Sequence, residues 1–294
     1  MDTEIGFHPD WLPQHQYPFE SRYIRIDGST IHYIDEGEGP LFLFLHGNPT
    51  FSFLYRHIIG AMRDRYRCVA LDYPGFGLSQ PATNYGFTPE EHGHILASFI
   101  EKLDLSGIHM MVQDWGGPIG MSVAVQMPER FNGFVIGNTW AWSVKGDTHF
   151  EFFSRSLGSP IGKALITQAN GFVNLVMPRG VAKKPIPPEI MDIYRAQFPT
   201  GNSRLPTWVF PKEIIGATDW LRGIQNNLHK IADKPALIVW GDKDIAFRKE
   251  ELEHWLSILT NSTLFPLKGA GHYIQEDAPY EIVQAIDNWM ENND

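Results

Sequence analysis

The hydrophobic and polar positions at the start of the chain follow the two-residue period of β-strands. Residues 23–26 and 30–34 alternate in this way, and Asp27-Gly28 stands between them. A turn-forming dipeptide between two alternating runs predicts an antiparallel hairpin. The run at residues 41–45 is instead wholly apolar. Such a run is typical of a strand that is covered on both faces.

From residue 68 onward, short apolar runs take turns with longer helical patterns. A helix is predicted over residues 89–103, because Thr88 can cap it and Glu91 completes a capping box. Further helices are expected at 116–127 and 280–290. The remaining strands are predicted at residues 68–71, 110–113, 134–136, 236–240 and 263–265. Alternation of this kind indicates an α/β fold with a mostly parallel, eight-stranded sheet flanked by helices.

The alternation stops between residues 139 and 223. This stretch is rich in aromatic residues and contains the proline-rich joint Pro185-Ile186-Pro187-Pro188, but it holds no convincing strand. We interpret it as a helical cap domain, residues 139–223, inserted into a core domain of residues 1–138 and 224–294. The cap is expected over the carboxyl ends of the strands, where open α/β sheets bind ligands.

Composition and charge narrow the class of protein. The 294 residues are 43% hydrophobic, and 24 Lys+Arg against 34 Asp+Glu give a net charge of −10. A chain of this kind can bury a large core, but it lacks the positive charge that nucleic acids or a polybasic membrane anchor require. No apolar stretch approaches the ~18 residues of a membrane span. The N-terminus, Met1-Asp2-Thr3-Glu4, lacks the pattern of a signal peptide. We therefore expect a soluble cytoplasmic protein.

A single cysteine, Cys68, excludes an internal disulfide and CxxC-type metal or redox sites. Because Cys68 lies inside the predicted strand 68–71, a buried and unreactive thiol is expected.

The strongest chemical signal is Gln113-Asp114-Trp115-Gly116-Gly117, between a predicted buried strand and a helix. A nucleophile elbow needs this context, with a sharp turn that projects one side chain and small residues after it. Here the projecting residue is Asp114. The alternative is that Asp114 only caps the following helix.

Two other loops follow predicted strands. His46-Gly47-Asn48-Pro49 follows the run at 41–45 and can direct a backbone N–H into a site, whereas His46 itself is interpreted as a structural residue. The loop at residues 72–79 contains Gly75 and Gly77, but Gln80 replaces the third glycine of a dinucleotide-binding motif, which disfavours nicotinamide binding.

A candidate base and a supporting acid come late in the chain. His272 follows Gly269-Ala270-Gly271 after the last predicted strand. The order Asp114, acid, His272 is that of a catalytic triad on an α/β sheet. Asp242 and Asp244 both follow the strand at 236–240, and Asp244 is favoured because the loop must first leave the strand. Asp242 remains the alternative.

In this order, these motifs resemble those of the α/β-hydrolase superfamily and, within it, of the haloalkane dehalogenases. The resemblance covers essentially the whole chain. It implies the α/β-hydrolase fold, with Asp114 as nucleophile, His272 as base and Asp244 as supporting acid. It also implies that Asn48 and Trp115 bind the halide. The combination of these two residues with a late aspartate resembles one subgroup of the family.

Such a set of groups suits displacement at a saturated carbon. A carboxylate, with a reference pKa of ~3.9, is ionised at neutral pH and can attack, whereas a serine hydroxyl is not. Side-chain N–H groups of Asn48 and Trp115 can receive the departing halide. His272 would then activate the water that hydrolyses the ester on Asp114, and backbone N–H groups of Asn48 and Trp115 would form the oxyanion hole. The expected partners are a small halogenated alkane and a halide ion, with no metal or organic cofactor. The sequence does not predict the oligomeric state.

Seven residues, mostly aromatic, are expected to line the substrate pocket: Trp140, Phe150, Phe153, Phe172, Ile245, Phe247 and Tyr273.

Rival functions are less well matched by the sequence. An epoxide hydrolase would need two cap tyrosines, and the predicted cap offers only Tyr194. A fluoroacetate dehalogenase would need cap cations, for which Arg155, Arg179 and Arg195 are candidates. An esterase is disfavoured by Asp114 in place of serine. A non-catalytic ligand sensor on the same fold is the remaining alternative, since a fold alone does not prove activity.

Overall fold

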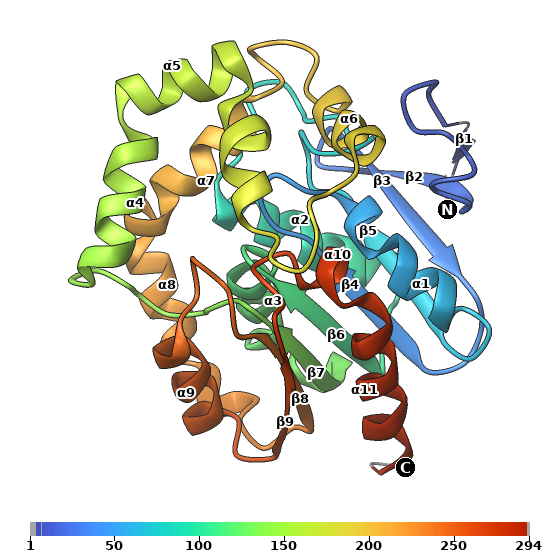
Figure 1. Cartoon of the computed structure of the whole chain (residues 1–294). Coiled ribbons are helices and arrows are strands. Elements are labelled where there is room, and N and C mark those ends of the chain that lie inside the picture. Colours follow the sequence, from blue (N-terminus) through green and yellow to red (C-terminus); the bar gives the residue numbers. More distant parts are fainter. Residues whose placement is uncertain (1–3, 7, 293–294) are drawn as a thin grey trace.

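The structure, a computed structural model, describes residues 4–6 and 8–292, and it is built around one sheet (Figure 1). The strand order in the sheet is β1-β2-β3-β5-β4-β6-β7-β8-β9. β1, β2, β3 and β5 pair antiparallel, whereas all pairs from β5 to β9 are parallel. The strands are β1 (Glu4–Gly6), β2 (Ser21–Ile26), β3 (Ser29–Glu36), β4 (Leu41–Leu45), β5 (Arg67–Leu71), β6 (Ile108–Gln113), β7 (Phe131–Gly137), β8 (Ala236–Gly241) and β9 (Ser262–Leu267).

Helices cover both faces of this sheet. α1 packs against α11, and α2 packs against α3. In Figure 1 the first pair lies in front of the sheet and the second pair behind it. The helices outside the predicted cap are α1 (Arg56–Met62), α2 (Pro89–Lys102), α3 (Gly116–Ala124), α9 (Lys249–Ile258), α10 (Ile274–Asp277) and α11 (Pro279–Glu291).

The mostly parallel α/β sheet and the opening hairpin are confirmed. Asp27 and Gly28 both have positive φ, 49° and 81°, which is the conformation that a two-residue hairpin turn needs. The strand count is corrected, because the described residues form nine strands and not the eight predicted. The additional strand is β1, which pairs with β2 at the sheet edge. Three largely exposed residues are too short a run to show a period.

Residues 138–235, all of them described, contain helices but no strand. In Figure 1, α4 to α7 lie together on one side of the sheet. α8 ends at Gln225, just past the predicted boundary at residue 223. The helices are α4 (Thr148–Gly158), α5 (Pro160–Ala169), α6 (Pro188–Ala196), α7 (Leu205–Gly216) and α8 (Thr218–Gln225), with the short turns η3 (Phe172–Val176) and η4 (Met177–Arg179) between α5 and α6.

Cys68 lies in the core, as expected, and is fully buried on β5. Burial raises the pKa of its thiol to about 12. The N-terminal residues 1–3, on which the prediction about a signal peptide partly depends, lie outside the described residues. Among the helices that the structure describes, none combines the length and the apolar character needed to cross a bilayer.

Candidate active site

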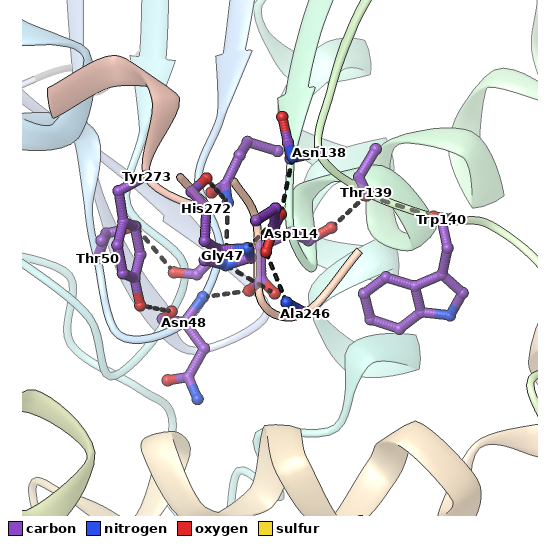
Figure 2. Close-up of polar contacts among 12 residues, drawn as sticks. Gly47, Asn48, Thr50, Asp114, Asn138, Thr139, Trp140, Ala246, His272 and Tyr273 are labelled. Carbon is purple, nitrogen blue, oxygen red and sulfur yellow. Dashed lines mark hydrogen bonds and ion pairs between the residues drawn. The ribbon is translucent and has the colours of Figure 1, made fainter. Parts of the chain in front are cut away.

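Asp114 occupies the turn between β6 and α3. Its φ of +50° is the left-handed conformation, which a non-glycine residue rarely adopts. The turn is held because the Asp114 N–H donates to the carbonyl of Asn138 at 3.1 Å, and the Gly117 N–H donates to the Asp114 carbonyl at 3.0 Å. Figure 2 shows the Asp114 side chain beside His272 and beside the loop that follows β4. A strained turn that projects one side chain at a strand end is the geometry of a nucleophile elbow.

The loop after β4 lies directly against this carboxylate. The backbone N–H of Asn48 donates to Asp114 Oδ1 at 2.7 Å. A Cβ atom at Gly47 would lie only 2.3 Å from the same oxygen, so the approach requires glycine. The N–H of Trp115, the other expected oxyanion donor, donates to no group that the structure describes.

His272 stands between two carboxylates. Its Nδ1 lies 3.0 Å from Asp244 Oδ2, and its Nε2 lies 3.6 Å from Asp114 Oδ2. The Asp244 side chain is fully buried and accepts two more hydrogen bonds, from Asn138 Nδ2 at 2.8 Å and from the Ala246 N–H at 2.6 Å. The alternative acid, Asp242, accepts instead from the N–H of Gly269.

The two carboxylates govern the charge of the imidazole. Burial by itself would lower the pKa of His272, but Asp244 and Asp114 outweigh burial and raise the pKa to about 10. The ring of His272 is therefore protonated at neutral pH. The nearby amide nitrogen of Gln113, 3.1 Å from His272 Nε2, fits the neutral ring instead. The carboxylates dominate over this amide, because two charged groups act on a ring shielded from water.

Sequence reasoning assigned no role to two residues that support the site. Gln113 is fully buried, and its Nε2 also donates to the His272 carbonyl at 3.0 Å. Asn138, at the end of β7, orients Asp244 and accepts the N–H of Gly241 at 2.8 Å. Gln113 could have been suspected from its place beside Asp114, whereas nothing in the sequence around Asn138 indicates its partner.

The two expected halide donors face one cavity. Asn48 Nδ2 donates to the carbonyl of Thr207 on α7 at 3.2 Å. Because an amide nitrogen carries two hydrogens, one remains free. The indole N–H of Trp115 donates to no group that the structure describes, and both residues line the same cavity.

This cavity contains Asp114 and His272 and is otherwise largely apolar. All seven predicted pocket residues lie on its wall, and Ile245 is also 56% exposed, which places it at the opening. No lysine or arginine is among the lining residues. The residues that sequence reasoning missed are His149, Val176, Gly180, Pro211, Ile214 and Ala246.

Residues proposed for rival functions lie elsewhere. The hydroxyl of Tyr194 donates to Glu276 Oε1 at 2.6 Å, and Tyr194 does not line the cavity. Arg155 and Arg195 form ion pairs with Glu151 and Asp192 at the surface. Arg179 contacts the carbonyl of Leu175 and does not line the cavity either.

His46 has the structural role expected of it. It is buried, its Nε2 accepts the N–H of Tyr73 at 3.1 Å, and its Nδ1 lies 3.0 Å from the Gly47 carbonyl. Burial lowers the pKa of His46 to about 4, so the ring is neutral.

A second histidine–carboxylate pair lies in the core. His32 Nδ1 contacts Asp72 Oδ2 at 2.8 Å, and His32 Nε2 contacts Ser21 Oγ at 2.9 Å. The three side chains connect β2, β3 and the end of β5. Each of the three residues is at most 1% exposed. None of the three lines the cavity that contains Asp114.

Comparison with known proteins identifies several relatives. A family model described as alpha/beta hydrolase fold matches residues 40–279. Haloalkane dehalogenase 2 of Mycobacterium bovis is 44% identical over 96% of this chain and 98% of its own. A cis-3-alkyl-4-alkyloxetan-2-one decarboxylase of Shewanella oneidensis is 31% identical over 93% of this chain and 89% of its own. A crystal structure of an ancestral haloalkane dehalogenase superimposes with a TM-score of 0.85 at 29% identity, covering 92% of this chain and 98% of that one.

Proposed function

Because the chain belongs to the α/β-hydrolase family, and within it to the haloalkane dehalogenases, we propose that the site around Asp114 breaks the carbon–halogen bond. The protein is an enzyme that hydrolyses haloalkanes to an alcohol, a halide ion and a proton. The relative with a different reaction, the decarboxylase, is less similar at 31% identity than the dehalogenase at 44%. What the comparisons leave open is which residue performs each step.

The first step is displacement by Asp114. A carboxylate oxygen attacks the carbon from the side opposite the halogen, a carbon–oxygen bond forms, and the halide leaves with the bonding electron pair. Asn48 Nδ2 and the Trp115 indole N–H donate to the departing halide, and they add no positive charge to the resting site. The apolar wall positions the substrate and excludes water.

The second step is hydrolysis of the ester on Asp114. His272 takes a proton from water, and the resulting hydroxide attacks the carbonyl carbon of Asp114. The Asn48 and Trp115 N–H groups stabilise the oxyanion, each contributing about 3 kcal/mol by analogy with other oxyanion holes. The alcohol leaves, and one oxygen of Asp114 now comes from water.

Alkylation prepares His272 for this role. The ester has no charge, so one of the two anions that raise the pKa of His272 is lost when it forms. The pKa of His272 therefore falls, and the ring can release its proton and act as a base. Asp244 remains to hold the ring and to stabilise its protonated form.

The segment at residues 139–223 is proposed to act as the cap of this site. It supplies most of the apolar wall, including Phe150, Phe172 and Ile214. Its α7 also contacts Asn48 through the carbonyl of Thr207. The segment thus closes the site above the nucleophile.

The observation that carries these assignments is that the His272 ring lies between the carboxylates of Asp114 and Asp244. We predict that a His272→Ala variant is still alkylated but stalls as the ester. Mixing the enzyme with a bromoalkane should release about one bromide per His272→Ala molecule. Mass spectrometry should find the alkyl group on the peptide with Asp114. An Asp114→Asn variant, matched in size, should release none. Continued turnover by His272→Ala would contradict the role of His272.

The halide site is tested separately. In a crystal soaked with bromide, anomalous scattering should place the ion within hydrogen-bond distance of Asn48 Nδ2 and Trp115 Nε1. The Asn48→Ala variant should bind bromide and chloride at least several-fold more weakly, because it loses one of two donors. Bromide bound elsewhere in the cavity, or unchanged affinity, would contradict the pair.

The same experiments separate the rival functions. A ligand sensor would release no bromide. An epoxide hydrolase needs an acid above the nucleophile, and Tyr194 is held by Glu276 outside the cavity.

A further inference from the structure

The loop that carries His272 is fastened to the predicted cap through backbone atoms. The carbonyl of Gly180, which directly follows η4, accepts the N–H of His272 at 2.6 Å and the N–H of Tyr273 at 3.1 Å. In Figure 1 this cap segment runs down beside α10, which begins just after His272. The backbone of the proposed base is thus held by a segment from a different part of the chain.

Asp277, at the end of α10, completes this contact. Its Oδ2 accepts the N–H of Gly271 at 2.7 Å and the N–H of Ala182 at 2.9 Å. Its Oδ1 accepts the N–H of Lys183 at 3.0 Å. One half-buried carboxylate therefore joins the residue before His272 to two residues of the cap segment.

The two segments lie too close for ordinary side chains at the contact. A Cβ atom at Gly271 would lie 2.4 Å from the Gly180 carbonyl oxygen. A Cβ atom at Gly180 would lie 2.5 Å from the ring of Tyr273. Backbone therefore packs on backbone here, and the position of the His272 loop depends on where the cap segment sits.

We propose that Asp277 is a positioning residue for His272, because it fastens the cap segment, residues 180–183, to the loop at residues 271–273. This inference rests on the proposed role of His272. Asp277 does not line the cavity and does not touch the reacting atoms. Its effect is confined to the step that needs a precisely placed imidazole, since small displacements of a catalytic group cost large factors in rate.

The consequence is a selective loss of one step. Alkylation depends on Asp114 and on the halide donors, none of which contacts Asp277, so its rate is kept. Hydrolysis of the ester depends on His272. Removal of the carboxylate frees the N–H of the preceding residue, Gly271, and leaves the loop held to the cap segment by the Gly180 carbonyl alone among the contacts described above. In an Asp277→Ala variant we therefore expect ester decay to slow tenfold or more, while first-turnover bromide release changes less than twofold.

The test measures both rates on the full-length enzyme with a bromoalkane, by rapid mixing for bromide and by quenched mass spectrometry for the ester on Asp114. An Asp277→Asn variant keeps one acceptor, the amide carbonyl oxygen, and should recover part of the rate. The control is Glu281→Gln. Glu281 pairs with Lys183 Nζ at 2.7 Å, so this variant neutralises one partner of an exposed ion pair on the same cap segment and leaves the backbone contacts intact. It should behave as the unaltered enzyme does.

Unchanged ester decay in Asp277→Ala, or an equal slowing of both steps, would overturn the inference. An equal slowing would indicate a general weakening of the fold. Failure of the unaltered enzyme to form an ester would instead contradict the proposed function, so the two failures are distinguishable.

Discussion

Two buried histidines show how local charge decides the state of a residue. His46 and His272 are both removed from water, and burial disfavours the charged ring in each. For His46 nothing offsets burial fully, and its pKa falls to about 4. His272 instead contacts the carboxylates of Asp244 and Asp114, and its pKa rises to about 10. The same residue type is therefore a neutral structural group in one loop and a protonated group in the other.

The raised pKa of His272 predicts a change of stability with pH. Because the folded pKa of about 10 exceeds the reference value of 6.5, protonation favours the folded state. This contribution is complete below about pH 6.5 and is lost as the pH rises toward 10. Urea denaturation should therefore show a larger loss of stability between pH 7 and 10 for the unaltered protein than for His272→Ala. Parallel losses in the two proteins would show that the raised pKa is wrong.

At the scale of elements, segments with a strong local pattern were predictable from the sequence. The capping box at Thr88 and Glu91 is present at the start of α2, with the Thr88 N–H bonded to Glu91 at 3.0 Å. The eight predicted strands all occur. α9 was not predicted, although Leu252, Trp255 and Ile258 are spaced three residues apart and pack against the core. α1 was also missed, since its seven residues span barely two turns.

The candidate site follows the same division. Asp114, His272 and Asp244 follow predicted strands, and parallel strands bring their carboxyl ends to one edge of the sheet. The structure places these three residues together, and their roles stay predictions. Asn138 and Asp277 could not be predicted, because their partners are backbone or side-chain atoms of segments distant in the sequence. Neither the spacing of motifs nor the hydrophobic period of a sequence indicates such a contact.

At the scale of the whole molecule, a buried ion pair joins two helices of the core, and a tyrosine of the predicted cap donates to it. Arg56 on α1 forms two hydrogen bonds with Glu276 on α10, at 2.6 and 2.9 Å. Tyr194 on α6 donates to the same carboxylate at 2.6 Å. Burial would raise the pKa of Glu276, but Arg56 outweighs it and the pKa is lowered. The Glu276 carboxylate is therefore ionised, and it accepts hydrogen bonds from both Arg56 and Tyr194.

We predict that Arg56→Ala lowers the free energy of unfolding by about 3–5 kcal/mol, because it leaves the Glu276 carboxylate buried without a counter-ion. Tyr194→Phe should cost only about 1–3 kcal/mol, since it removes one hydrogen bond to a charged group. Urea denaturation monitored by tryptophan fluorescence measures both values. Equal small losses would mean that the ion pair between Arg56 and Glu276 contributes no more than the single hydrogen bond from Tyr194 of the cap.

The sealed trio of Ser21, His32 and Asp72 has a consequence for how hydrolases are recognised. A search for serine hydrolases that matched interatomic spacing alone would select these residues and assign the wrong chemistry to the wrong place. Each of them is closed to any reagent, so a fluorophosphonate should leave Ser21 unlabelled as long as the protein is folded. Access of a reagent to the serine, rather than the spacing of the three side chains, distinguishes a catalytic trio from a structural one.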